Sequence, residues 1–352
     1  MVAVVSVAVA WMAWLYFAAD LPSIDGRYLS AEAFEAQYGT RIYRYRVLSR
    51  GLLAAMEPGL RGWATPAFAS RWSSFLGALF IINVVFLGLT TWQLLHMIYR
   101  SRFLAVRRRR AAFVLLASVV TITGVTVNAY DFVAYWLLLG TVWFSFVYLE
   151  RPSAGILGWV VAMTALATFN RETAALGVAL FAALQLSRHG LRWRGLWPTA
   201  IVTAAFAVPY FGLRLWLGWG SATHNRSELL HNLTEPIGIL GLVVWCAATA
   251  ACIRWAHSRS NRQLVVLFNV AAAPYWAMCL YAGRMEELRL FVPLLLIDFW
   301  LAVRSRRQSP SPSSSSSTTR SSSSSSSPGS GPSCSSSSSC SRSSSAFLSR
   351  IR

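Results

Sequence analysis

The stretch RIYRYRVLSR, residues 41–50, places four arginines and two tyrosines within ten residues of a largely apolar chain. A guanidinium is a planar fork of hydrogen-bond donors that matches the oxygens of a phosphate and keeps its charge. Arg44 and Arg46 are therefore candidate ligands for the phosphate of a lipid-linked substrate. The alternative is a membrane-surface segment whose arginines snorkel toward water.

Three short turns carry further polar groups, in the stretches VNAYDFVAY, TFNRETAAL and GRMEELRLFVP. Any one of them alone can be a solvated hairpin with an internal Arg–Glu pair. Three such turns on one face, opposite a long charged loop, favour a binding site instead. The candidate substrate-binding residues are Arg44, Arg46, Asp131, Asn170, Arg171, Glu172, Glu286, Glu287 and Arg289.

The elements that position these residues are long apolar runs. The chain has 352 residues, of which 55% are hydrophobic and 13% charged, and its apolar runs approach the ~20 residues that a helix needs to cross a bilayer. We predict an all-α, polytopic transmembrane helical bundle of about ten spans. The predicted spans are residues 2–19, 74–99, 111–129, 132–149, 154–169, 173–186, 195–217, 236–253, 264–281 and 290–303.

Basic residues set the orientation of such a bundle. If the N-terminus is cytoplasmic, the cytoplasmic connectors contain sixteen arginines and the short outer connectors contain four. This distribution agrees with the positive-inside rule and predicts that both termini are cytoplasmic. The net charge of +19 is concentrated in these connectors, so we interpret it as a topology signal and do not expect a nucleic-acid partner.

Acidic residues follow a second pattern. Eleven of the thirteen carboxylates fall on the outer side in this topology, although acidic residues contribute little to orientation. We therefore expect any chemistry on the outer face.

The long outer loop, residues 20–73, is predicted to hold amphipathic interfacial helices. Residues 42–56 place Tyr45, Leu48, Leu52 and Met56 at helical spacing, and YLSAEAFEAQY is a weaker case of the same pattern. The apolar run 173–186 covers only roughly 21 Å. Either the bilayer thins there, or the preceding Asn-Arg-Glu turn lies below the membrane surface in a protein-lined cavity.

Two charged residues fall inside predicted spans, where ionisable groups are costly. Asp298 is expected to pair with Arg304 or to snorkel, and Arg214 is expected to snorkel from the outer end of its span. The transmembrane domain is predicted to extend over residues 1–307. Residues 308–352 are a serine-rich, low-complexity segment that we expect to be disordered.

This layout resembles the GT-C class of integral-membrane glycosyltransferases, which take a sugar from a polyprenyl phosphate carrier on the outer side of the membrane. The similar features are a first span, a long first outer loop with early acidic residues in AADLPSIDGRY, interfacial helices in that loop and charged later turns. The resemblance covers residues 1–303 as architecture. The chain is short for the class, and its Asp20 and Asp25 are five residues apart, unlike the close aspartate pair of many members.

The resemblance implies an inverting sugar transfer, so the chain would be a hexosyl- or pentosyltransferase. In that class the catalytic carboxylate lies in the first outer loop, which points to Asp25 as the base and Asp20 as the second choice. The arginines would stabilise the departing phosphate. No cofactor is required, a divalent cation stays open, and no metal ligand set is assigned.

The implied partners are membrane lipid and a polyprenyl-phosphate-linked sugar donor, and the oligomeric state is left open. The expected location is the bacterial plasma (inner) membrane with the active face outside, or alternatively the endoplasmic reticulum. Two other functions remain open. A transporter or lipid-carrier flippase would need charges or broken helices near the membrane midplane, and a nonenzymatic scaffold would tolerate loss of the outer carboxylates.

Overall fold

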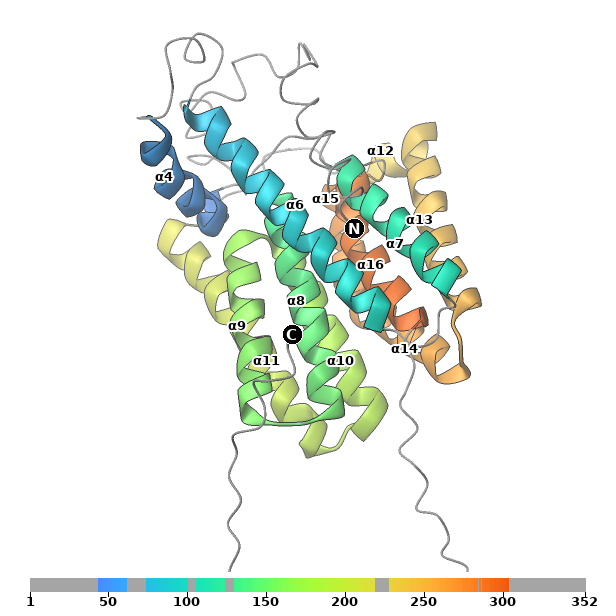
Figure 1. Cartoon of the computed structure of the whole chain (residues 1–352). Coiled ribbons are helices and arrows are strands. Elements are labelled where there is room, and N and C mark those ends of the chain that lie inside the picture. Colours follow the sequence, from blue (N-terminus) through green and yellow to red (C-terminus); the bar gives the residue numbers. More distant parts are fainter. Residues whose placement is uncertain are drawn as a thin grey trace, which may run out of the picture. The chain divides into compact units, whose positions relative to one another are not determined.

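The described part of the chain is helical. The computed structural model describes residues 44–61, 74–100, 106–123, 130–218, 228–283, 285 and 287–303, and these hold no strand. All of them belong to one unit, Met1–Arg306. The α-helices, followed in order in Figure 1, are α4 (Val47–Arg61), α6 (Ser74–Arg100), α7 (Val106–Ile122), α8 (Asp131–Glu150), α9 (Ala154–Asn170), α10 (Ala175–His189), α11 (Trp193–Leu217), α12 (Leu229–Thr234), α13 (Pro236–Trp255), α14 (Arg259–Ala271), α15 (Ala273–Ala282) and α16 (Leu288–Val303).

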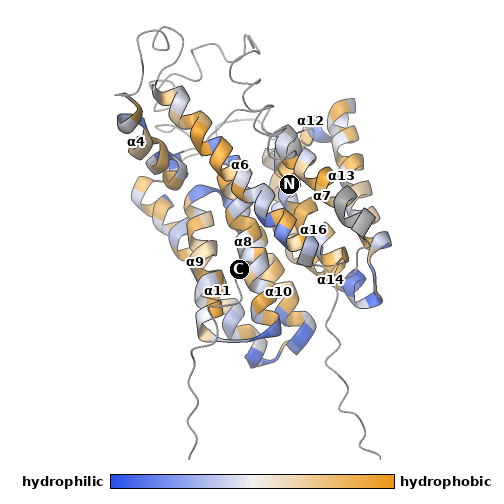
Figure 2. Ribbon diagram, in the orientation of Figure 1, coloured by the Kyte–Doolittle hydropathy of each residue, from blue (hydrophilic) through white to orange (hydrophobic). Residues whose placement is uncertain are grey.

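Four helices are long and apolar enough to cross a membrane: α6, α8, α11 and α13. A fifth crossing is present if α14 and α15 form one broken span. Figure 2 shows apolar residues along the lengths of these helices and polar residues gathered at several helix ends and connections. The described part of the chain is therefore all-helical, with several helices suited to a membrane.

Helices lie in nine of the ten predicted ranges, although residues 124–129 of the range 111–129 and the whole of the range 2–19 lie outside the described residues. The range 264–281 is not one straight helix. The helix breaks at Ala272, and α14 and α15 meet at a bend of 51°. Pro274 in the first turn of α15 explains the break, because it lacks the N–H that would bond to the carbonyl four residues earlier.

Local sequence accounts for several helix boundaries. The Ser153 side chain accepts a hydrogen bond from the Ile156 N–H (3.3 Å) and caps α9, and Ser258 caps α14 in the same way through the Asn261 N–H (3.1 Å). α10 ends at Gly190, whose φ of 62° lies in the left-handed region that glycine adopts without strain.

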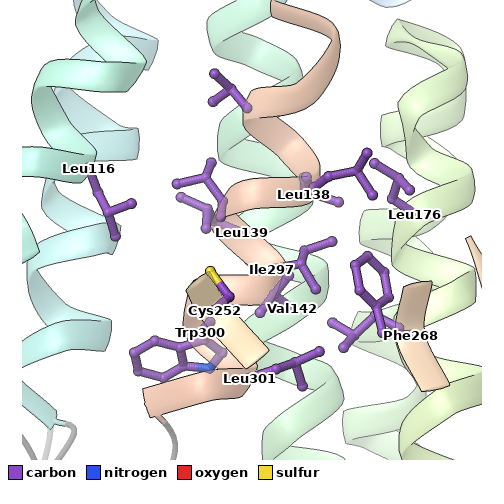
Figure 3. Close-up of a cluster of buried hydrophobic side chains, with 14 of the residues drawn as sticks. Leu116, Leu138, Leu139, Val142, Leu176, Cys252, Phe268, Ile297, Trp300 and Leu301 are labelled. Atoms are coloured by element: carbon purple, nitrogen blue, oxygen red, sulfur yellow. The ribbon is translucent and has the colours of Figure 1, made fainter. Parts of the chain in front are cut away.

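The helix α8 lies at the centre of the packing, with neighbours that include α6, α9, α10 and α16. Gly177 lets α10 approach closely, since a Cβ there would lie 2.8 Å from Thr141 Cγ2 of α8. The largest core cluster joins α6, α7, α8, α10, α13, α14, α15 and α16. Figure 3 shows part of it, where Val142 of α8 lies near Ile297 of α16.

Several contacts join helix ends. The Arg188 guanidinium of α10 donates to the Leu149 carbonyl near the end of α8. The segment between α13 and α14 meets the end of α16, where the His257 N–H donates to the Ala302 carbonyl (3.1 Å). The turns at residues 130–131 and 170–171, both predicted to be outer, also contact each other.

Candidate functional site

An ion pair joins two of the turns that the sequence singled out. Asp131 begins α8, and Arg171 follows the last residue of α9 in an extended conformation (φ −163°, ψ 150°). The Arg171 guanidinium pairs with the Asp131 carboxylate, and these residues are 5% and 3% exposed. Asn170 and Arg171 of the Asn-Arg-Glu turn are therefore buried, whereas Glu172 is partly exposed.

Asn170 ties the same turns to the segment that precedes α6. Its Nδ2 donates to the Tyr130 carbonyl (2.8 Å), and its Oδ1 accepts from the Ser49 hydroxyl of α4. Asn170 is completely buried. Since each bond joins a different element, the amide fixes α4, the start of α8 and the end of α9 together.

The tyrosine ring of Tyr130 lies beside two cations. The Arg46 guanidinium carbon is 3.7 Å from the ring centroid, and that of Arg171 is 5.8 Å away. Both distances are within the range of a cation–π interaction. Arg46 is buried and precedes α4, whereas Arg50, one turn later, is exposed. These two arginines of one segment therefore differ, and Arg46 lies against the protein.

A third arginine, Arg214 of α11, completes this end of the bundle. Its guanidinium carbon lies 3.6 Å from the Tyr210 ring centroid and 4.5 Å from that of Tyr45. Its Nη2 is 3.9 Å from Glu172 Oε1. Snorkelling of Arg214 from the outer end of its span stays a prediction, and these three groups surround its guanidinium there.

Arg44 and Tyr45 fasten the N-terminal segment to the end of α11. The Tyr45 hydroxyl donates to the Gly218 carbonyl (2.7 Å) and accepts from Arg44 Nη2 (3.0 Å), which also donates to that carbonyl. Gly218 has a φ of 82°, in the region that favours glycine. We call the whole group the arginine–tyrosine cluster: Arg44, Tyr45, Arg46, Tyr130, Asp131, Asn170, Arg171, Glu172, Tyr210 and Arg214.

The cluster contains four guanidinium groups and two carboxylates, so it attracts anions. Burial acts against the charge on Arg171 and Asp131 acts for it, and on balance the pKa of the guanidinium is raised above its ordinary value. Arg171 is therefore charged at any physiological pH. Asp131 is paired with Arg171. Glu172 is the other carboxylate of the cluster, which also holds Arg44, Arg46 and Arg214.

The cluster has an inner and an outer part. Arg46, Asp131, Asn170 and Arg171 are buried, whereas Arg44, Glu172 and Arg214 are partly exposed. Groups in the outer part can contact a ligand directly. Groups in the inner part hold the turns in place and supply positive potential.

An apolar groove of about 440 Å³ runs between α9 and α11. Its lining includes Val161, Ala165 and Phe169 of α9 and Ile201, Val208 and Pro209 of α11. Phe169 directly precedes Asn170, and Pro209 directly precedes Tyr210. The groove therefore ends beside the arginine–tyrosine cluster, so a hydrocarbon chain and an anionic group can be accommodated next to each other.

The third turn is anchored separately. The Asn232 side chain donates to the Leu280 and Gly283 carbonyls (2.8 and 2.7 Å) and accepts from the Met285 N–H (2.9 Å). The Tyr275 hydroxyl donates to the Leu290 carbonyl (2.7 Å) and so joins α15 to α16.

The sequence-derived residues divide into three groups. The structure brings Arg44, Arg46, Asp131, Asn170, Arg171 and Glu172 into one cluster, although their roles stay predictions. Glu287 lies in the third turn, where its carbonyl accepts from the Leu290 N–H (3.0 Å). Asp20, Asp25 and Glu286 lie outside the described residues, as does the side chain of Arg289.

Sequence reasoning missed the aromatic half of the cluster. Tyr210 and Arg214 are four residues apart on one helix, a spacing that places them on the same face, and this signal could have been read. Tyr45 and Tyr130 each neighbour a residue that was singled out. The contact between Tyr45 and Arg214 joins segments far apart in the chain and had no local signal.

In the part of the chain that the structure describes, no three or more His, Cys, Asp or Glu side chains gather as a metal ligand set would. The divalent cation stays a prediction. Comparisons with protein-family models, curated proteins and solved structures find no match to this chain.

Proposed function

We propose that this chain is a membrane glycosyltransferase that moves a sugar from a polyprenyl phosphate carrier to an acceptor on the extracytoplasmic face. The observation that carries the proposal is the arginine–tyrosine cluster, in which four arginines from distant segments converge beside an apolar groove. A lipid phosphate has this combination of properties, because its head is anionic and its tail is a hydrocarbon chain.

Arg214 and Arg44 would contact the phosphate, since both are partly exposed. Glu172, 3.9 Å from Arg214, would orient that guanidinium. Arg46 and Arg171 would act from behind, held by the Tyr130 ring and the Asp131 carboxylate. Charged groups fixed in a poorly solvated site stabilise charge that develops on a leaving group.

The carrier's chain would lie in the groove between α9 and α11, whose lining is apolar. The acceptor hydroxyl would give its proton to a carboxylate while its oxygen attacks the anomeric carbon. The bond from that carbon to the phosphate oxygen breaks, and the polyprenyl phosphate leaves with both electrons. Asp25 is the proposed base and Asp20 the second choice, as the GT-C resemblance implies.

The proposal includes the finer topology of the chain. In this topology the chain has about ten spans, cytoplasmic termini and a long first outer loop, and Asp131, Asn170 and Arg171 lie on the outer side. The pairing of connectors supports this arrangement, because turns predicted on one side contact one another. The proposed location is the bacterial plasma membrane, with the endoplasmic reticulum as the alternative.

The test is transfer of labelled sugar from a panel of polyprenyl phosphate sugars by the purified full chain in detergent. Four variants accompany the wild type: Asp25→Asn, Asp20→Asn, Arg214→Met and Arg50→Met. Asp25→Asn should abolish turnover while donor binding persists, and Arg214→Met should weaken donor binding. Arg50 is exposed, so Arg50→Met serves as the matched control and should behave as the wild type. Absence of both turnover and donor binding would rule the proposal out.

A lipid-carrier flippase is the second candidate, and the break between α14 and α15 favours it. Broken helices inside a membrane are common at the sites of transporters. The two functions separate in proteoliposomes that contain a fluorescent polyprenyl phosphate. Exchange of that lipid between leaflets without sugar transfer would favour the flippase.

A further inference from the structure

A second polar group lies apart from the arginine–tyrosine cluster and takes no part in the proposed function. Asp298 of α16 is 1% exposed. Asn269 Nδ2 of α14 donates to its Oδ1 (2.8 Å), and the Thr249 hydroxyl of α13 lies 3.2 Å from its Oδ2. The predicted partner Arg304 lies outside the described residues, and the carboxyl contacts neutral groups of two neighbouring helices.

No charged side chain of the described residues interacts with Asp298. Among the helices packed against α16, α13 places one titratable group near Asp298, the Cys252 thiol. The interactions of Asp298 include no titratable group of α8, α10 or α14. The charged groups of these helices lie elsewhere: Asp131 is paired with Arg171, Arg188 contacts Leu149, and Glu150, Arg254, Arg259 and Arg262 are exposed. The arginine side chains at the start of α7 lie outside the described residues.

The surroundings of Asp298 are apolar. Its neighbours in sequence, Ile297 and Trp300, belong to the largest buried cluster together with Cys252 and Phe268, and Figure 3 shows these four side chains around α16. An ionised carboxylate without a cation is strongly disfavoured in such a place, and the group takes up a proton instead.

The hydrogen-bond partners accommodate a carboxylic acid. Asn269 donates one N–H to Asp298 and the other to the Val265 carbonyl (3.0 Å), and its Oδ1 accepts from Trp276 Nε1 (3.2 Å). The Asn269 amide therefore faces Asp298 with a donor, and its oxygen is directed toward Trp276. The Thr249 hydroxyl can accept as well as donate, so it can receive a hydrogen bond from a protonated Oδ2.

We propose that Asp298 is a proton-binding site, a carboxylic acid that donates to Thr249 and accepts from Asn269. The proton comes from the aqueous phase and forms an O–H bond at Oδ2. Through Asn269 and Trp276 the network spans the break between α14 and α15. Loss of the proton would leave a bare charge among three helices and would loosen the packing at that break.

The test is infrared spectroscopy of the full chain in detergent. A protonated carboxyl gives a carbonyl band above the amide band, and the band shifts down in D2O. We expect this band in the wild type at neutral pH, its loss in Asp298→Asn and its retention in Glu150→Gln, the matched control. A wild type without the band, or a band that persists in Asp298→Asn, would overturn the proposal.

A second variant keeps the test decisive if Asp298→Asn does not fold. Thr249→Val removes the hydroxyl that accepts the hydrogen bond from the protonated carboxyl of Asp298. The carbonyl band should therefore move to higher frequency, as expected for a carboxylic acid whose O–H is no longer hydrogen-bonded. An unchanged band in a folded Thr249→Val protein would contradict the assignment.

Discussion

Asp131 and Asp298 are both buried aspartates, 3% and 1% exposed, and they face opposite kinds of partner. Asp131 pairs with the guanidinium of Arg171, whereas Asp298 has the amide of Asn269 and the hydroxyl of Thr249. Burial alone therefore does not decide whether a carboxylate keeps its charge. The partners decide it, and the two regions of the molecule use the same residue type as an anion and as a neutral acid.

The Asp131 region and the third turn each contain a fully buried asparagine that fixes a turn. Asn170 joins the turn at Tyr130 to Ser49, and Asn232 holds the turn at Gly283 and Met285. The first asparagine lies within a charged cluster and the second among backbone groups. The charged character of the first region thus comes from its arginines and not from how its turns are built.

The largest effect is expected from breaking the ion pair. Asp131→Leu leaves Arg171 buried without its carboxylate, so the free energy of unfolding should fall by about 3–5 kcal/mol. Asp298→Asn is close in shape to the neutral acid and should cost less than about 1 kcal/mol at neutral pH. The measurement is unfolding by SDS titration of protein in mild detergent.

A double variant controls this prediction. Asp131→Leu with Arg171→Met removes both charges, so it should be more stable than Asp131→Leu alone. If the double variant instead loses as much unfolding free energy as Asp131→Leu and Arg171→Met lose together, the pair contributes through packing and not through charge.

The next largest effect is expected at Asn232. Asn232→Ala removes three hydrogen bonds and leaves the buried Met285 N–H without its acceptor, so unfolding should become easier by about 2–3 kcal/mol. Its neighbour in α12, Leu233, is exposed, and Leu233→Ala is the matched control. Equal losses in the two variants would show that the amide does not hold the turn.

Arg46 and Arg50 allow a smaller comparison within one segment. Arg46→Met keeps the length of the side chain and removes the cation over the Tyr130 ring, 3.7 Å from its centroid, which should cost about 1–2 kcal/mol. Arg50→Met, at an exposed position, should change stability by less than about 0.5 kcal/mol. Thermal unfolding of both purified variants measures the difference, and equal values would place Arg46 at the surface.

The smallest effect concerns pH. Burial opposes and Asp131 favours the charge of Arg171, and its pKa is raised on balance. A base with a raised pKa in the folded state contributes stability that is complete below its unfolded pKa and is lost only above it, and for arginine that lies far above physiological pH. The difference in thermal midpoint between the wild type and Arg171→Met should therefore be the same at about pH 6 and about pH 9. A difference that shrinks toward pH 9 would contradict this.

Sequence reasoning predicted the helices well because long apolar runs carry their own signal. The ranges of α8 and α9 agree with their predicted spans to within a residue at most ends. It failed at Ala272, since the bend there comes from one proline inside an apolar run. The amphipathic helix α4 was expected, but its start at Val47 left Arg46 outside the helix and turned toward Tyr130.

The candidate site was predictable in part for a related reason. Asp131 and Arg171 stand out because charges are rare in such a chain, and both are next to helix ends that must meet if short turns connect antiparallel helices. The contacts of Arg214 and the partners of Asp298 depend on which helices pack together. That information is spread over residues such as Gly177 and Thr141, whose close approach has no counterpart in the local sequence.

The uneven burial of the helices has a consequence for how the sequence can drift. In the most apolar 18-residue stretch of α8, 67% is buried inside the protein, compared with 11% for the corresponding stretch of α11 and 17% for that of α13. Substitutions around the whole circumference of α8 change the shape of a packed surface, so few residues are acceptable at each position. Much of α11 and α13 needs only to stay apolar. Homologues of this chain should therefore diverge fastest along α11 and α13 and keep the side-chain volumes of α8, so α8 is the segment by which distant relatives can be aligned.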